Sequence, residues 1–176
     1  MGAEIKSDSK YIYLKADKLK PIEFEFPKIS VTGTENLMMA AVFTKGKTTL
    51  KNCAKEPEVV ELANFLNKCG ASIHGAGEST IEITGVDSLG SVEWDVLFDR
   101  IEAGTYLVAG AITNGHITVK KIEPKTIQVL TNKLIEMGVH VSYGENWVEA
   151  DATSSEITCV DIGLSLIHIS EPTRLS

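Results

Sequence analysis

Two short stretches near the start of the chain alternate between apolar and polar residues. Residues 11–15 and 22–26 both follow the period-two pattern of a half-buried strand, the second of them without a break. Pro21 and Pro27 flank the second stretch, which limits its length. We therefore expect two short strands, each with one buried face.

The spacing then changes to that of a helix. Residues 35–45 carry an apolar stripe at intervals of three and four, formed by Leu37, Met38, Ala41 and Val42. Thr32 and Glu35 have the spacing of a capping box, and Gly46 suits a helix end. This pattern predicts a helix over residues 35–45, followed by a strand over residues 48–52.

A second helix is expected to begin at Pro57, because proline at the first helical position loses no hydrogen bond. Glu56 and Glu58 flank that proline, and carboxylates there are favoured by the helix dipole. Gly70 ends the helix, and two strands are expected over residues 71–74 and 80–84.

The same order of elements then returns. Asp99 and Glu102 form a second capping signal, and the glycines that end the elements recur 69 and 68 residues later, Gly46 at Gly115 and Gly70 at Gly138. We predict two copies of a helix, strand, helix, strand, strand unit. The residues expected to be buried in them are Leu37, Val42, Val60, Phe65, Leu66, Leu107, Val108, Leu130 and Leu134. Residues 85–97 are interpreted as a linker or hinge between the copies.

Composition excludes several classes of protein. The chain has 17 basic and 24 acidic residues and a net charge of -7, which argues against a nucleic-acid-binding surface. It has no apolar run near the roughly 18 residues that a membrane helix needs, so membrane insertion is not expected. The cysteines, Cys53, Cys69 and Cys159, form no metal-binding spacing, and they suit a reducing cytoplasm.

Three groups of residues are candidates for chemistry, each with a structural alternative. Residues 28–34 lead into a helix N-terminus, where backbone amides together with Lys28 and Ser30 suit a phosphate; the alternative is an ordinary capped loop. Glu56 and Glu58 also have a sufficient role in favouring a helix start. A cap with a local ion pair explains Asp99, Arg100 and Glu102 as well as a site does. These patterns predict an α/β repeat protein with an anion site, which leaves open a non-catalytic binding module.

Three longer motifs carry a specific resemblance. Residues 26–41, 55–66 and 99–105 occur in the order and at the separations found in the UDP-N-acetylglucosamine 1-carboxyvinyltransferase family of enolpyruvyl transferases, and the likeness runs from about residue 2 to residue 151. The resemblance implies an α/β (α+β) fold, an inside-out barrel built from βαβαββ units. It assigns residues 1–97 to the first domain and residues 98–162 to the start of a segment that returns to the second.

The family transfers the enolpyruvyl group of phosphoenolpyruvate to the 3-hydroxyl of UDP-N-acetylglucosamine and releases phosphate, the first committed step of peptidoglycan synthesis. The resemblance implies both substrates as small-molecule partners and no cofactor or metal. The nucleotide-sugar contact segment matches Lys28, Ile29, Ser30 and Val31, with Thr32, Glu56 and Glu58 as second-rank candidates.

The departures from the family are equally informative. The catalytic cysteine loop and the catalytic aspartate of the family match nothing here, so we expect an internal fragment, with Met1 an internal methionine, that is inactive alone. Residues 163–176 resemble a translated adapter and are expected to be a non-native tail. The related 3-phosphoshikimate 1-carboxyvinyltransferase is the nearest enzyme alternative.

Overall fold

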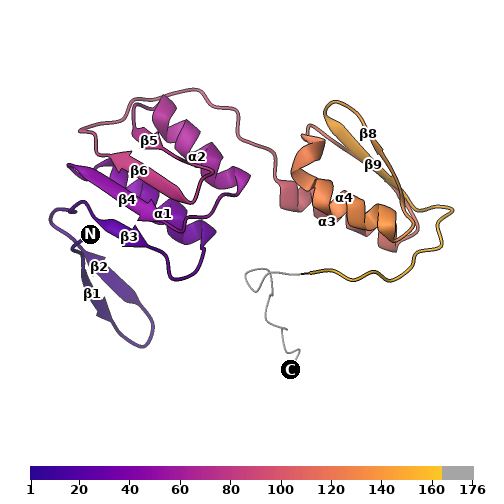
Figure 1. The fold of residues 1–176 in the computed structure, drawn as a ribbon, viewed down its shortest axis with the longest axis horizontal. Helices are drawn as coiled ribbons and strands as arrows, with labels where there is room; N and C mark the ends of the chain where they lie inside the picture. The colour runs from indigo at the N-terminus through magenta and orange to yellow at the C-terminus, as the bar shows by residue number, and fades with distance from the viewer. Residues whose placement is uncertain (164–176) are drawn as a thin grey trace. The chain divides into compact units, whose positions relative to one another are not determined.

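The computed structural model describes residues 1–163, and the chain divides into two compact units. Unit 1 is Met1–Val96, and unit 2 begins at Leu97 (Figure 1). Of the predicted tail, 163–176, only Gly163 lies within the described residues. The two units are described separately below.

Unit 1 is built on a four-stranded sheet with the order β3-β4-β6-β5. Its strands are β3 (Glu23–Glu25), β4 (Lys47–Lys51), β5 (Ser72–His74) and β6 (Thr80–Thr84). Helix α1 (Val31–Val42) connects the parallel strands β3 and β4, and helix α2 (Pro57–Lys68) precedes β5. Both helices cover the same face of the sheet (Figure 1). The chain order is therefore βαβαββ.

The core of unit 1 lies between this sheet and its helices. Its fully buried large side chains include Met38, Leu50, Val59, Ile81 and Ile83. Three residues of the predicted core, Leu37, Val60 and Phe65, are only half-buried. They lie on the flanks of their helices, because a helix resting on one sheet buries only a narrow central stripe.

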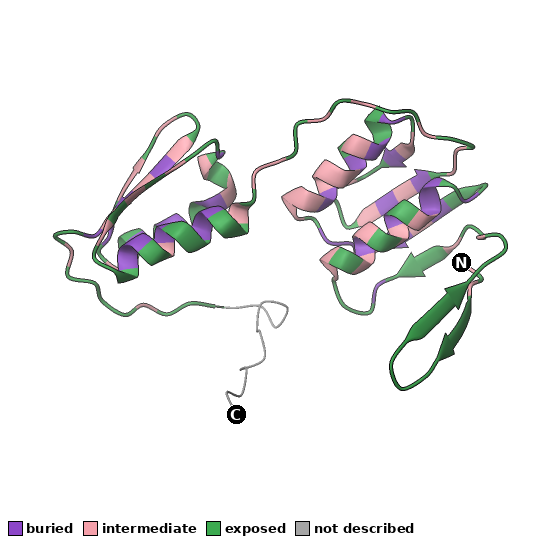
Figure 2. Ribbon diagram, turned by 180° about the vertical axis from the view of Figure 1, so that it is seen from behind, coloured by how far each residue is buried: buried purple, intermediate pink, exposed green. Residues whose placement is uncertain are grey.

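A separate two-stranded hairpin precedes this sheet. Strand β1 (Glu4–Ser7) pairs antiparallel with β2 (Ile12–Lys15). Every residue of both strands is exposed (Figure 2), so the predicted buried face is wrong for residues 11–15. A ribbon of two strands has no layer of its own to cover its apolar side chains.

Unit 2 repeats the same elements without the first strand. Helix α3 (Arg100–Ile112) is followed by β7 (His116–Lys120), the 3-10 helix η1 (Pro124–Ile127), α4 (Gln128–Glu136), β8 (His140–Tyr143) and β9 (Trp147–Asp151). Its sheet order β7-β9-β8 matches β4-β6-β5, which confirms the predicted repeat. Leu107 and Leu134 are buried as expected, whereas Val108 and Leu130 are half-buried.

The predicted linker, residues 85–97, is bound to unit 1 along most of its length. The amides of Val86 and Gly90 donate hydrogen bonds of 2.8 and 2.7 Å to carbonyls at the C-terminal ends of α1 and α2. Trp94 stacks edge-on against Phe65 and donates a 2.8 Å hydrogen bond to a carboxylate of α2. The predicted linker therefore packs on unit 1 as far as Trp94, and the boundary between the units follows Val96, which is 85% exposed.

The architecture is a mixed α/β fold. The described residues form three separate open sheets, and none of these sheets closes into a barrel. Among those same residues, every helix is too short or too polar to cross a lipid bilayer.

Candidate functional site

The four first-rank residues form the connection between β3 and α1. The side chains of Lys28 and Ile29 are exposed, whereas Ser30 and Val31 are partly buried where the helix begins. Within residues 1–163, Lys28 has no hydrogen bond or ion pair. Its ammonium group is therefore available to an anion in solvent.

Helix α1 starts earlier than predicted. Its cap is Ser30, whose hydroxyl accepts a 3.1 Å hydrogen bond from the amide of Gly33. The expected capping box of Thr32 and Glu35 is wrong, because both residues lie inside the helix. A side chain at Gly33 would lie 2.9 Å from the Ser30 hydroxyl, so the cap depends on glycine there.

The positive end of α1 is not neutralised by its own residues. The first turn contains no acidic side chain, and the amides of Val31 and Thr32 donate to no described residue. Helix α3 differs, because Asp99 accepts hydrogen bonds of 2.8 and 3.0 Å from its first amides and Glu102 lies in its first turn. Backbone amides, the helix dipole and Lys28 together favour an anion at α1 rather than at α3.

The second-rank carboxylates lie beside this helix, at the start of α2. Glu56 caps α2 through its backbone only, and its Oε2 atom is buried without a hydrogen-bond partner. Glu58 lies in the first turn, as the helix-dipole interpretation predicts. The loop that carries them is joined to α1 by a 3.1 Å hydrogen bond from the amide of Ala54 to the hydroxyl of Thr34.

Glu35 shows that α1 and this loop are close. Its pKa is raised above the ordinary value, first by burial of its carboxyl and then by the charges of Glu58 and Glu56. The structure therefore brings the second-rank residues to the same end of unit 1 as residues 28–34. The hydroxyl of Thr34 was missed at the sequence level, where a threonine inside a helix gives no signal of a tertiary contact.

Glu35→Gln is expected to stabilise unit 1 at about pH 7 and to change nothing at about pH 3.5. In the folded state the pKa of the Glu35 carboxyl is raised above its ordinary value of 4.5. The stability that the neutral carboxyl gives unit 1 is therefore fully present below pH 4.5 and is lost as the pH rises through the raised pKa. Thermal unfolding followed by amide signals of β4 and β6 measures this, with the exposed Glu145→Gln as control. An equal gain at both pH values would contradict the charge explanation.

The remaining candidates include a cap residue of unit 2 and two buried cysteines of unit 1. Asp99 acts as the cap of α3, which supports its structural interpretation. Cys53 and Cys69 are buried, and burial raises the pKa of the Cys53 thiol. The described residues contain no cluster of three or more side chains suited to a metal ion.

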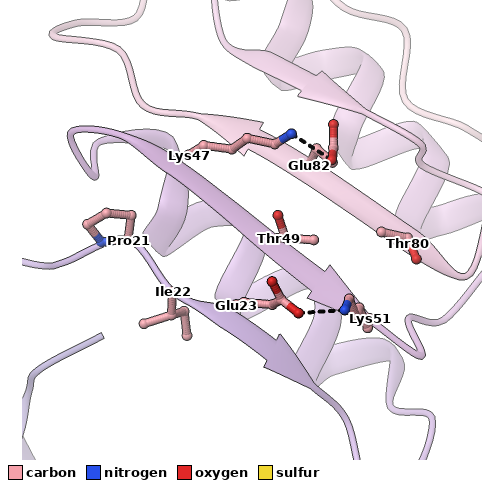
Figure 3. A pocket seen from close by; sticks show the side chains of 8 residues that line it. All are labelled: Pro21, Ile22, Glu23, Lys47, Thr49, Lys51, Thr80 and Glu82. Atoms are coloured by element: carbon pink, nitrogen blue, oxygen red, sulfur yellow. Dashed lines mark hydrogen bonds and ion pairs between the residues drawn. The ribbon is translucent and has the colours of Figure 1, made fainter.

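A surface pocket lies on the outer face of the unit 1 sheet, away from the helices (Figure 3). Two ion pairs cross it, from Lys47 to Glu82 at 2.7 Å and from Lys51 to Glu23. The hydrogen bond and charge of Lys51 lower the pKa of Glu23. The charged side chains that line this pocket are already paired with one another, so we interpret this face as a solvated sheet surface.

Comparison with curated proteins shows strong similarity to one group of enzymes. The chain is 49% identical over 163 residues to the UDP-N-acetylglucosamine 1-carboxyvinyltransferase of Coxiella burnetii. The matched region covers 92% of this chain and 38% of the relative. The chain thus spans well under half the length of the curated relatives that it matches.

Solved structures show the same fold at lower identity. The enolpyruvyl transferase NikO from Streptomyces tendae matches 85% of this chain with a TM-score of 0.70 and 22% identity. EPSP synthase from Acinetobacter baumannii matches 86% with a TM-score of 0.60 and 20% identity. The model of the EPSP synthase (3-phosphoshikimate 1-carboxyvinyltransferase) family matches residues 1–170. With its motifs, its fold and this match in agreement, the chain belongs to the EPSP synthase family of enolpyruvyl transferases.

Proposed function

We propose that this chain is part of a UDP-N-acetylglucosamine 1-carboxyvinyltransferase and supplies one wall of its nucleotide-sugar site. The reaction moves the enolpyruvyl group of phosphoenolpyruvate to the 3-hydroxyl of UDP-N-acetylglucosamine and releases phosphate. The observation that carries the proposal is the 49% identity to enzymes of that name, against 20–22% for the solved structures of related transferases.

The geometry at the start of α1 suits the charged part of such a ligand. Lys28 supplies a cation, and the amides of Val31 and Thr32 supply donors at the positive helix end. Ile29, 48% exposed, offers an apolar surface beside them. Ser30 acts indirectly, because its hydroxyl already accepts from Gly33 and shapes the turn.

We further propose that both units are pieces of inside-out barrels, in which helices face the interior and sheets face solvent. The polar outer face of the unit 1 sheet supports this (Figure 3). So do the large apolar side chains that the helices leave exposed, such as Phe43 at 57% and Ile112 at 73%. Residues 1–97 then belong to the first domain and residues 98–162 to the start of the returning segment of the second.

The reaction assigns the protein to the cytoplasm, where nucleotide sugars are made, and requires no nucleic acid. The net charge of -7 is consistent with both assignments. Transfer by the related 3-phosphoshikimate enzyme is the second candidate, favoured by the description of the matching family model. A purely non-catalytic module is not supported by relatives that are named as transferases.

An amide NMR titration distinguishes the two transfer reactions. We expect UDP-N-acetylglucosamine at millimolar concentration to shift residues 28–34, because a single wall makes few of the contacts of a complete site. We expect 3-phosphoshikimate and inorganic phosphate at equal concentration to cause smaller shifts there, because they share only the anionic group with the nucleotide sugar. Shifts from 3-phosphoshikimate alone would favour the shikimate enzyme and overturn the proposal.

A further inference from the structure

Thr34 has a buried hydroxyl that joins two segments of unit 1. Its residue is 0% exposed, and its Oγ1 atom donates a 2.7 Å hydrogen bond to the carbonyl of Ser30. The same oxygen accepts the 3.1 Å hydrogen bond from the amide of Ala54. The hydrogen bond to Ser30, within the same helix, would already satisfy the Thr34 hydroxyl. The hydrogen bond from Ala54 therefore links the helix to another segment in addition.

The second unit shows what this position looks like without that tie. The strands β4 and β7 begin 69 residues apart, at Lys47 and His116, and the residues after them, Asn52 and Lys121, both have positive φ. With the same offset, Thr34 corresponds to Ala103. Unit 2 therefore has no hydroxyl at the equivalent place.

The loops that follow these strands differ in length. Four residues, 53–56, separate Asn52 from Pro57, whereas only residues 122 and 123 separate Lys121 from Pro124. The longer loop begins with Asn52, whose Nδ2 atom donates a 2.7 Å hydrogen bond to the carbonyl of Phe26. Thr34 holds it again at Ala54. The loop with two more residues, in unit 1, is therefore also the loop that is held by the Thr34 hydroxyl.

These anchors connect the two sets of candidate residues. Ser30, whose carbonyl binds Thr34, belongs to the wall of residues 28–31. Ala54, which binds the same hydroxyl, lies two residues before Glu56 and four before Glu58. A shift of this loop relative to α1 would therefore change the distance between the wall and both carboxylates.

We propose that Thr34 is a positioning residue for the nucleotide-sugar site, which holds the loop of Glu56 and Glu58 in register with residues 28–31. The inference rests on the proposed function and adds the residue that fixes the relative position of its two segments. Thr34 itself is buried and does not touch the ligand.

The test compares amide NMR titrations with UDP-N-acetylglucosamine on the parent chain and on substituted chains. Thr34→Val keeps the shape and removes the hydroxyl, so we expect Kd to rise about three- to tenfold. Thr34→Ser keeps the hydroxyl and should restore the parent Kd. Without ligand, the amide of Ala54 should exchange faster with solvent only in Thr34→Val.

Thr131→Val is the matched control. Thr131 is also 0% exposed, but its hydroxyl bonds only to Gln128 in its own helix segment. We expect its Kd to equal that of the parent. If Thr34→Val does not fold, Thr34→Ala, with the side chain of the equivalent Ala103, is measured in its place.

The outcomes separate the two proposals. A parent chain that does not bind UDP-N-acetylglucosamine overturns the proposed function and this inference with it. A parent chain that binds, with an unchanged Kd in the hydroxyl-free variant, overturns the inference alone. Equal weakening in Thr34→Ser and Thr34→Val would also overturn it, because packing rather than the hydroxyl would then be responsible.

Discussion

Purified 176-residue chain, mixed with phosphoenolpyruvate and UDP-N-acetylglucosamine, is expected to release phosphate no faster than a mixture without protein. Enolpyruvyl transfer needs a group that moves protons and groups that stabilise charge in the transition state. The site described above offers a cation, helix amides and carboxylates, which bind and orient. It provides only part of the required chemistry.

The cysteines illustrate what is missing. Cys53 is 1% exposed and its pKa is raised by burial, so its thiol is a poor acid at neutral pH. Cys69 is buried at the C-terminal end of α2. Cys159 is exposed and lies after β9 in unit 2.

A coupled phosphate assay measures this prediction, with the full-length Coxiella burnetii relative as positive control. Phosphate release that exceeds background and requires both substrates would show that the chain holds a complete catalytic apparatus. It would also contradict the prediction that none of Cys53, Cys69 and Cys159 is a catalytic cysteine.

Helix starts were predictable where one cap signal stood alone. Pro57 begins α2 and Asp99 caps α3, as their local chemistry requires. For α1 the predicted cap, Thr32, is wrong, and Ser30, two residues earlier, is the cap. Thr34, whose hydroxyl accepts a hydrogen bond from the amide of Ala54, lies in the first turn of the helix that Ser30 caps, and the local pattern does not encode that contact.

Burial was predictable along the centre of each helix but not at its flanks. Val42 and Leu107 are buried, whereas Leu37 and Val60, on the flanks of their helices, are half-buried. The hairpin β1–β2 was harder, since alternation cannot tell whether another layer covers the apolar face. Strand β1 was missed because its four residues contain only one apolar side chain, Ile5.

The candidate site also has parts that were predictable from the sequence and parts that were not. Residues 28–31 were proposed through a motif, and the prediction that they lead into a helix is confirmed, although the helix starts earlier than predicted. The proximity of Glu56 and Glu58 to α1 could not be read from the sequence, because it depends on a loop held by Asn52 and Thr34. Both tethers are hydrogen bonds between segments some twenty residues or more apart, which periodicity does not encode.

Replacement of Lys28 tests the central claim, that residues 28–31 hold the nucleotide sugar. Lys28→Ala removes an exposed cation without disturbing the core, and such a contact is worth up to about 1 kcal/mol. We therefore expect Kd for UDP-N-acetylglucosamine to rise up to about fivefold. Lys125→Ala, an exposed lysine at η1 of unit 2, is the control and should leave Kd unchanged.

The decisive measurement is the map of amide shifts during this titration. We predict shifts concentrated in residues 28–34 and 53–58 of the parent chain, reduced at equal ligand concentration in Lys28→Ala and retained in Lys125→Ala. Shifts that spare residues 28–34, or that persist unchanged after Lys28→Ala, would show that the start of α1 does not hold the ligand.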